Sequence, residues 1–295
     1  MLRITFYDII KKEKGVSMLL DCKKLKEEIF DDLKIKLKKI NKTLTLSVIE
    51  IGNNDSNKIY LKQKEKMCEE LGYNFNHIKL EDNIKEERII DIIKTLNNND
   101  EIDGILLQLP IPKHLDYKKL KNIINPLKDI DGLNEINQNK LIKGETSLIP
   151  CTALGIIKLL DYYNINFKDK NVVIIGRSDI VGKPLYNILC KETKVTLCHS
   201  KTEDIKKYTK EADILIVAIG KANFITEEYI KKGVIIIDVG INRLNNKICG
   251  DVDYLSVKDK VSYITPVPNG VGKLTIAMLA YNLYESYKMK VGGNL

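Results

Sequence analysis

The sequence predicts an α/β protein of two domains, each built around a parallel β-sheet. The chain has 295 residues, about twice the usual length of one domain. Short apolar stretches alternate with longer segments of helical apolar spacing, as in chains that form parallel sheets. Several of the short stretches are apolar at consecutive positions, which is typical of strands covered on both faces.

The first half of the chain alternates between helical and strand patterns. A turn at 52–55 separates the first strand from the next helix, and Pro110 and Pro112 end the last strand. The predicted elements are a helix at 19–40, a strand at 44–50, a helix at 56–72, a strand near 75–80, a helix around 86–96 and a strand at 104–109.

The second half repeats this alternation more clearly, with predicted strands at 171–175, 194–198, 214–219 and 234–238. A helix starting around Thr152 places the domain boundary near Pro150. We expect one domain from 18–150 and a second from 151–274. The last helix, from about Thr275 to the end at 295, is expected to pack back on the first domain.

The composition excludes several classes of protein. It is 44% hydrophobic and 30% charged, as in soluble globular proteins, and no apolar run approaches the roughly 20 residues of a membrane span. The net charge of +8 raises the alternative of a nucleic-acid-binding protein. Lysines are mixed with acids, as at 23–28, so we interpret most of this charge as solvated helix faces. We therefore expect no nucleic-acid or membrane partner.

The cysteines and histidines argue against a metal site. No two cysteines form a CxxC pair, and the only histidines are His77, His114 and His199, far apart in sequence. Scattered cysteines without a signal peptide favour reduced thiols and a cytoplasmic protein. The six cysteines stand at 22, 68, 151, 190, 198 and 249.

Residues 1–17 lack the apolar core and cleavage site of a secretory signal. Codons for Lys14, Gly15 and Val16 can contain a ribosome-binding sequence shortly before Met18. We expect Met18 to be the natural start and 1–17 to be a spurious or disordered extension. A genuine N-terminal extension is the alternative.

A glycine-containing turn follows the predicted strand at 172–175. Gly176, Ser178 and Gly182 can supply the tight turn, the small residues and the helix N-terminus that a dinucleotide pyrophosphate needs. The pattern departs from a regular GxGxxG, because Ser178 replaces the second glycine and the third comes one residue late. Its place between a buried strand and a helix favours a Rossmann-type domain over a plain strand–helix turn.

The end of the next strand indicates which dinucleotide binds. An NAD-binding domain places Asp or Glu on the ribose hydroxyls about twenty residues further on. Residues 197–202 contain no acid at this point. His199, Ser200 and Arg177 can instead bind a 2′-phosphate, so the sequence favours NADP over NAD. The alternative is that Ser200 caps a helix and His199 is merely exposed.

Lys64 interrupts an apolar face of the helix predicted at 56–72. A lysine there can extend its amine to water, or can be a partly buried amine with a lowered pKa, ready for proton transfer. Gln108, at the end of a buried strand, also needs a polar partner. The neighbours of Lys64 on that face are Tyr60, Met67, Cys68 and Leu71.

Nine short motifs occur in a fixed order along the chain. They are Tyr60-Leu61-Lys62-Gln63-Lys64, Gly104-Ile105-Leu106-Leu107-Gln108-Leu109-Pro110, Lys128-Asp129-Ile130-Asp131-Gly132, Pro150-Cys151-Thr152, Gly176-Arg177-Ser178 with Val181-Gly182-Lys183-Pro184, Cys198-His199-Ser200, Asp238-Val239-Gly240-Ile241-Asn242, Gly250-Asp251-Val252 and Thr265-Pro266-Val267-Pro268. In this order they resemble the bifunctional methylenetetrahydrofolate dehydrogenase/cyclohydrolase family. The resemblance covers nearly everything from Met18 onward.

The resemblance implies NADP-linked oxidation of 5,10-methylenetetrahydrofolate to the methenyl cation, which water then opens to 10-formyltetrahydrofolate. By similarity, Lys64 is the catalytic lysine, Gln108 tunes it, Tyr60 packs on the folate ring system and Asp131 binds the pterin. The family is a homodimer whose two domains flank a cleft. It acts in one-carbon metabolism and purine biosynthesis.

Similarity also assigns the remaining site residues, with no metal among the ligands. The residues implied to bind cofactor are Gly176, Arg177, Ser178, Val181, Gly182, His199, Ser200, Thr202, Gly220 and Ile241. The residues implied to bind substrate are Tyr60, Lys64, Gln108, Leu109, Pro110, Asp131, Pro268 and Gly270.

The sequence departs from the family pattern most at 268–275, where Asn269, Lys273 and Leu274 replace a glycine, a proline and a methionine. Asn269 can keep the turn, because Asn tolerates positive φ better than most residues. The departure makes a dehydrogenase without cyclohydrolase activity the main alternative. A shikimate-type dehydrogenase and an inactive NADP-binding protein are further alternatives. Smaller departures are Cys22, Ala153 and Ala222.

Overall fold

The computed structural model describes residues 18–245 and 247–292, and the prediction about 1–17 lies outside them. The chain forms two compact units. The described part of the six-strand unit comprises 18–21, 163–177 and 189–271, and that of the three-strand unit comprises 22–162, 178–188 and 272–292.

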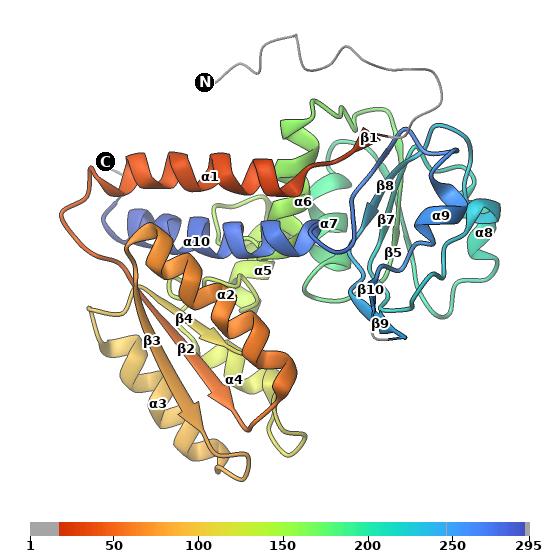
Figure 1. Cartoon of the computed structure of the whole chain (residues 1–295). Coiled ribbons are helices and arrows are strands. Elements are labelled where there is room, and N and C mark those ends of the chain that lie inside the picture. The colour runs from red at the N-terminus through yellow and green to blue at the C-terminus, as the bar shows by residue number, and fades with distance from the viewer. Residues whose placement is uncertain (1–17, 246, 293–295) are drawn as a thin grey trace. The chain divides into compact units, whose positions relative to one another are not determined.

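The three-strand unit holds a parallel sheet in the order β3-β2-β4 (Figure 1). Side chains alternate along β2, so that Leu46 and Val48 join one apolar cluster and Ile49 and Ile51 join another. Its elements are α1 Cys22–Leu37, β2 Thr45–Ile51, α2 Asp55–Leu71, β3 Asn74–Leu80, α3 Glu86–Asn98, β4 Gly104–Leu107, α4 Tyr117–Ile123, α5 Glu135–Lys143, α6 Cys151–Tyr162, most of α7 Gly182–Leu189 and most of α10 Val271–Lys290.

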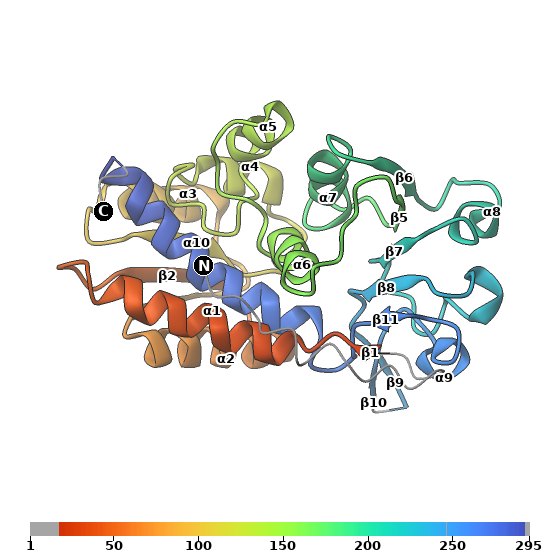
Figure 2. The same cartoon turned by 90° about the horizontal axis from the view of Figure 1, so that it is seen from above.

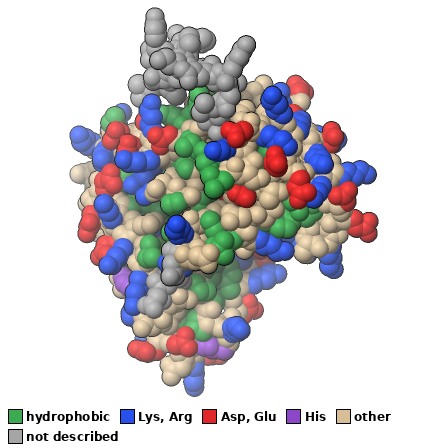
Figure 3. Space-filling model, turned by 45° about the vertical axis from the view of Figure 1, so that its right-hand side comes forward, with side chains coloured by type: hydrophobic (Ala, Val, Ile, Leu, Met, Phe, Trp, Pro, Cys, Tyr) green, Lys and Arg blue, Asp and Glu red, His purple; other side chains and the backbone are tan. Residues whose placement is uncertain are grey.

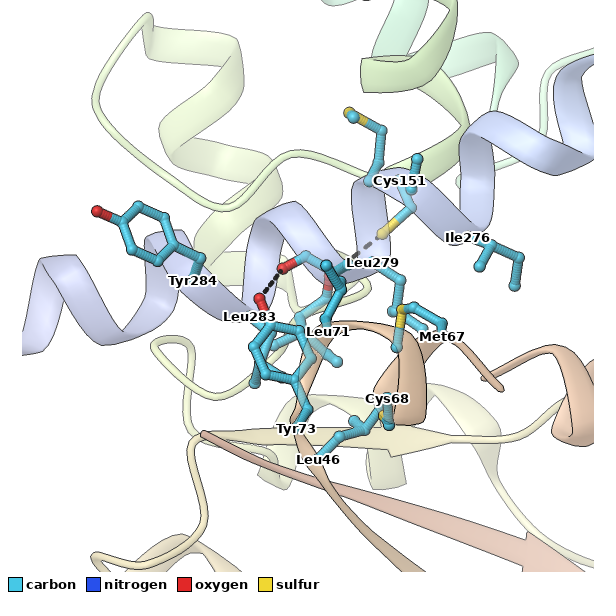
Figure 4. Close-up of a cluster of buried hydrophobic side chains, with 14 of the residues drawn as sticks. Leu46, Met67, Cys68, Leu71, Tyr73, Cys151, Ile276, Leu279, Leu283 and Tyr284 are labelled. Atoms are coloured by element: carbon cyan, nitrogen blue, oxygen red, sulfur yellow. Dashed lines mark hydrogen bonds between the residues drawn. The ribbon is translucent and has the colours of Figure 1, made fainter. Parts of the chain in front are cut away.

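The first cluster joins segments that are far apart in the sequence. Figure 4 shows Leu46 of β2, Met67 of α2 and Leu283 of α10 packed together, with the Tyr73 hydroxyl donating to the Ala280 carbonyl at 3.2 Å. Helices α1 and α10 run side by side over this core in both ribbon views (Figures 1 and 2). The last helix therefore belongs to the core of the three-strand unit, as the sequence predicts.

The opposite face of the same sheet packs on α3 and α4. Ile89 and Ile93 of α3 and Leu120 of α4 are fully buried against the second cluster. The Lys128 amine, itself buried, donates to the carbonyls of Leu96, Asn97 and Asn99 at 2.8–3.0 Å. It thereby satisfies carbonyls at the C-terminus of α3 that have no partner within the helix.

The six-strand unit holds a parallel sheet in the order β1-β11-β8-β7-β5-β6. Strand β5 lies between β6 and β7, so the chain leaves β5 toward one side for β6 and returns to its other side for β7. Its elements are β1 Met18–Leu19, β5 Asn171–Ile175, β6 Lys194–Cys198, α8 Ile205–Thr209, β7 Ile214–Val217, η1 Glu227–Tyr229, β8 Ile235–Asp238, β9 Asn242–Leu244, β10 Lys247–Cys249, α9 Tyr254–Val257 and β11 Tyr263–Ile264.

The predicted strands and helices are confirmed with small shifts at their ends. The strand predicted at 104–109 ends at Leu107, and the one predicted at 214–219 ends at Val217. The last helix begins at Val271, before the predicted Thr275. The sequence analysis missed β1, which pairs with β11 only through the tertiary fold.

The surface supports the interpretation of the positive charge as solvated helix faces. On the face drawn in Figure 3, lysines and arginines are interspersed with acids. On α1, for example, Lys36 pairs with Asp32 at 2.6 Å, four residues away. Among the described residues, no helix is long and apolar enough to cross a membrane.

Candidate active site

Lys64 and Gln108 meet in the interior of the three-strand unit. Lys64 lies on α2 with 8% of its surface exposed, and its amine donates to Gln108 Oε1. Gln108 follows the last residue of β4, and its Nε2 donates to the Leu109 carbonyl at 2.7 Å. That second bond fixes the amide so that its oxygen faces the lysine. The fold thus pairs the two buried polar side chains that the sequence singled out.

Burial lowers the pKa of Lys64 from its ordinary value, and attraction to Asp131 only partly opposes this effect. No carboxylate in the described residues forms an ion pair with the amine. The predicted buried amine of lowered pKa is therefore confirmed, and the alternative of a lysine extended to water is wrong. Met67, Cys68 and Leu71 are buried on the same face, whereas Tyr60 is 39% exposed and does not join the apolar stripe.

Asp131 lies near Lys64 on a turn that the surrounding backbone holds tightly. Burial raises the pKa of its carboxyl group, while Lys64 and the Cys151 thiol lower it. Gly132 follows with φ +71°, and a Cβ there would approach the Ile149 carbonyl carbon and the Pro150 nitrogen at 2.6 Å. Only glycine fits this position without displacing the backbone.

Asn282 of α10 ties the same turn in place. Its Nδ2 donates to the Ile130 carbonyl at 2.8 Å and to the Ile149 carbonyl at 2.9 Å. The Cys151 thiol also donates to Ile130, at 3.3 Å. Sequence reasoning missed Asn282, because nothing in the pattern of α10 shows that it faces residues 130 and 149.

The other predicted substrate residues in this unit lie at its surface. Tyr60 is half-exposed on α2, so its ring is open to a ligand. Leu109 is half-buried and Pro110 is exposed, directly after Gln108. The three-strand unit therefore combines a buried amine with exposed apolar groups on the segments that carry it.

In the six-strand unit, several of the residues predicted to bind cofactor follow the carboxyl ends of the strands. The strand order reverses at β5, and open parallel sheets bind ligands beyond the carboxyl ends at such a reversal. Gly176 follows β5 with φ +113°, and a Cβ there would lie 2.1 Å from the Ala218 carbonyl oxygen. The glycine therefore lets the loop after β5 lie against the loop after β7.

The loops after β5 and β6 present the groups expected at a 2′-phosphate. Arg177 and Ser200 are exposed and His199 is half-exposed. The His199 amide donates to Thr202 Oγ1 at 2.9 Å, and the Lys201 amide donates to His199 Nδ1 at 3.1 Å. Because Nδ1 accepts a hydrogen bond, a neutral His199 carries its proton on Nε2 and remains a donor. Ser200 does not cap a helix, since Asp204 occupies the N-cap of α8.

The turn before α7 has its own hydrogen bonds. Ser178 Oγ accepts from the Val181 amide at 3.2 Å, and the Ser178 carbonyl accepts from the Lys183 amide at 3.1 Å. Val181 and Gly182 are buried where α7 begins. Ser178 therefore acts in the local turn, which a glycine in its place could not do through a side chain.

The remaining predicted residues lie on loops of the six-strand unit. Gly220 has φ +65° and Ile241 is 52% exposed. Asn269 has φ +73°, which confirms that it keeps a turn where the family has glycine. Pro268 is exposed before it, and a Cβ on Gly270 would lie 2.0 Å from the Pro266 carbonyl oxygen.

These groups fit a dinucleotide better than a metal. No cluster of three or more potential metal ligands occurs among the described residues. Gly176 forms a cradle that a side chain would fill, and the loop after β6 offers donors without an acid between 197 and 202. Fold and site together define a dinucleotide-dependent enzyme that also contains a buried lysine of lowered pKa.

Comparison with known families identifies which enzyme this is. Residues 20–131 match the tetrahydrofolate dehydrogenase/cyclohydrolase catalytic domain, and residues 150–291 match the NAD(P)-binding domain of the same family. The chain belongs to the tetrahydrofolate dehydrogenase/cyclohydrolase family, as the ordered motifs predict. This excludes the alternative of a shikimate-type dehydrogenase.

Relatives resemble the chain over nearly its whole length. Bifunctional protein FolD of Sulfurihydrogenibium sp. (strain YO3AOP1) is 45% identical over 281 residues, which cover 93% of this chain and 99% of that protein. The bifunctional FolD structure from Campylobacter jejuni is 44% identical with a TM-score of 0.91, covering 93% and 99% of the two chains. A Trypanosoma brucei relative, solved with NADP cofactor and inhibitor, is 29% identical with a TM-score of 0.87, covering 94% and 99%.

Proposed function

We infer that this chain oxidises 5,10-methylenetetrahydrofolate with NADP⁺ and hydrolyses the methenyl product to 10-formyltetrahydrofolate. Bifunctional relatives at 44–45% identity over nearly the full length support both activities. The structural observation that carries the hydrolytic step is the buried Lys64 amine held by Gln108. A dehydrogenase without cyclohydrolase activity is not favoured, because it would have no use for this pair.

We propose that neutral Lys64 is the proton acceptor in ring opening. A protonated lysine would repel the cationic methenyl group and could not take a proton from water. With a lowered pKa, the amine accepts a proton as the water oxygen bonds to the methenyl carbon. The C–N5 bond then breaks as the added hydroxyl loses its proton and becomes the formyl C=O. N5 keeps the electron pair and gains a proton, and one proton is released overall. Gln108 keeps the amine at one place during these steps.

The oxidation requires alignment more than acid–base help. NADP⁺, when bound, accepts a hydride from the one-carbon unit. We propose that Asp131 accepts hydrogen bonds from the pterin amino and ring N–H groups, and that the exposed Tyr60 ring packs on the folate. Leu109, Pro110, Pro268 and Gly270 are proposed to complete the substrate site.

We propose that the cofactor is held beyond the carboxyl ends of β5, β6 and β7. Gly176 gives room to the pyrophosphate, while Arg177, His199 and Ser200 are proposed to bind the 2′-phosphate. The other residues proposed to bind cofactor are Ser178, Val181, Gly182, Thr202, Gly220 and Ile241.

Further parts of the proposal rest on family resemblance. We propose a folate domain from 18–150 with 275–295, and an NADP domain from 151–274. We also propose a cytoplasmic homodimer that supplies one-carbon units for purine biosynthesis. Equilibrium sedimentation would test the dimer, and a monomer at micromolar concentration would contradict it.

The purified protein with 5,10-methylenetetrahydrofolate and NADP⁺ tests the function directly. We expect NADPH, together with 10-formyl product that forms faster than methenyltetrahydrofolate hydrolyses without enzyme. Methenyl product that drains only at the spontaneous rate would leave a dehydrogenase alone and implicate the altered segment 268–275. No reduction of either NADP⁺ or NAD⁺ would contradict the proposed function.

A further inference from the structure

Two buried carboxylates in the six-strand unit are not used by the chemistry described above. Asp251 is fully buried and Asp238 is 3% exposed. The proposed mechanism assigns no role to either carboxylate. Burying a carboxylate is unfavourable unless hydrogen bonds compensate it, so the partners of these two groups indicate what they do.

The partners of Asp251 are three consecutive backbone amides of one loop. Its Oδ2 accepts from the amides of Ile219 at 2.7 Å and Gly220 at 3.0 Å, and its Oδ1 accepts from Lys221 at 2.8 Å. Asn242 Nδ2 adds a fourth bond to Oδ1 at 2.9 Å. A single carboxylate therefore fixes the loop that follows β7 and joins it to Asn242, the first residue of β9.

Asp238 in turn fixes the backbone around Asp251. Its Oδ1 accepts from the amides of Gly240 and Asp251, and its Oδ2 accepts from Val252, all at 3.0 Å. A Cβ on Gly250 would lie 1.8 Å from Asp238 Oδ2, and a Cβ on Gly240 would lie 2.3 Å from Asp251 Oδ1. The two glycines thus leave the space that the two carboxylates occupy.

The loop held by Asp251 lies where the strand order of the sheet reverses. It follows β7, directly beside the loop after β5, because Gly176 contacts the Ala218 carbonyl. A dinucleotide on this sheet passes between these two loops. The amides at 219–221 point to Asp251 and are not free to bind phosphate, so this loop acts as a shaped wall rather than as an anion site.

We propose that Asp251 is a positioning residue for the dinucleotide: it holds residues 219–221 as one wall of the cofactor site, and Asp238 holds Asp251. The proposal rests on the proposed function of this sheet. It predicts a different defect from loss of the 2′-phosphate ligands. NADP and NAD should be affected alike, since neither Asp251 nor residues 219–221 are among the proposed 2′-phosphate ligands.

Asp251→Asn tests this proposal, because one carboxylate oxygen becomes an NH₂ group. In one orientation of the amide this NH₂ group faces the Lys221 and Asn242 donors, and in the other it leaves Ile219 without an acceptor. We expect at least tenfold weaker NADP⁺ binding by calorimetry and a raised KM for NADP⁺. The ratio of NADP⁺ to NAD⁺ affinity should stay within twofold. Hydrolysis of added methenyltetrahydrofolate should also stay within twofold, because Lys64, Gln108 and Asp131 belong to the other unit.

Asp253→Asn is the matched control. Asp253 accepts a hydrogen bond from the Ser256 backbone amide at 3.3 Å, but it caps α9 and does not hold the loop at 219–221. Should Asp251→Asn fail to fold, Asn242→Ala removes one bond to the carboxylate and is expected to give the same pattern at about threefold. Unchanged NADP⁺ affinity in the folded variants would overturn the proposal, and so would a parallel loss of both activities. Calorimetry separates this result from failure of the proposed function, which wild-type turnover tests.

Discussion

Two buried ionisable groups, Lys64 in the three-strand unit and Asp251 in the six-strand unit, have opposite kinds of partners. In the three-strand unit, Lys64 is buried beside the neutral Gln108 amide. Burial lowers the pKa of Lys64 and so favours the neutral amine. In the six-strand unit, Asp251 is buried with four N–H donors and serves the backbone. A buried ionisable group with few partners is available for proton transfer, whereas one with a full set of partners fixes a loop.

The same contrast explains which groups are exposed. Arg177 and Ser200, proposed to bind a phosphate, lie at the surface and need no change of pKa to act. Lys64 is buried, and its removal from water lowers its pKa and so favours the neutral amine. The proposed proton chemistry and the proposed anion binding therefore need different degrees of burial.

Lys64→Met is the strongest test of the role proposed for the buried lysine. We expect ring opening to fall by about 10³-fold, the usual contribution of a positioned base, while the fold remains intact. Hydrolysis of methenyltetrahydrofolate is the measurement. Lys62→Met, an exposed lysine on the same helix, should behave like the wild type. Wild-type hydrolysis by Lys64→Met would refute the assigned role of the lysine.

The same variant should raise stability, because a lysine of lowered pKa destabilises the folded state. We expect the free energy of unfolding at pH 7 to increase. The gain should shrink as the pH rises toward 10.5, where the unfolded chain also loses its proton. Urea unfolding at pH 7 and pH 10 measures both quantities, and a loss of stability at pH 7 would argue against a desolvated amine.

The exposed side of the contrast is tested by Arg177→Ala combined with Ser200→Ala. Loss of two phosphate contacts should weaken NADP⁺ binding by about 100-fold and leave NAD⁺ binding nearly unchanged. KM values for both dinucleotides measure the effect. Lys194→Ala is the control: it removes a positive charge at the other end of β6 and should leave NADP⁺ binding unchanged. Equal losses for the two dinucleotides would contradict the 2′-phosphate assignment.

Gly132→Ala tests how tightly the Asp131 turn is held. Gly132 and Gly72 share φ +71°, but only Gly132 has backbone within 4 Å of the added Cβ. We expect Gly132→Ala to lower the free energy of unfolding by about 2 kcal/mol and Gly72→Ala by about 1 kcal/mol. Denaturant titration of both variants measures the difference. Equal losses would mean that the turn adjusts and does not fix Asp131.

Gln108→Glu is expected to shift the pH profile of hydrolysis. A carboxylate beside Lys64 favours the charged amine and raises its pKa. Because only the neutral amine accepts a proton, the rise of hydrolysis with pH should move upward by about one pH unit, with about tenfold lower activity at pH 7. Gln63→Glu, exposed on α2, provides the control. An unchanged pH profile would mean that Gln108 does not influence the pKa of Lys64.

Sequence patterns alone predicted most of the elements, because apolar periodicity records which side of a strand or helix is buried. They also singled out Lys64 and Gln108, since a polar residue in an apolar pattern is locally anomalous. The pairing of β1 with β11 was not predictable, because two-residue strands carry no periodicity. Tyr60 was misplaced on a buried stripe, because the pattern does not show where the neighbouring elements end.

The sequence by itself determined the fold class, the dinucleotide turn and the family, since these depend on residue order along the chain. Only the tertiary structure showed that Lys64 faces Gln108, that Asn282 ties Ile130 to Ile149, and that Asp251 accepts three successive amides. Hydrogen bonds between residues 30 to 152 positions apart leave no local pattern, because the distances between such residues are set by packing of the whole unit.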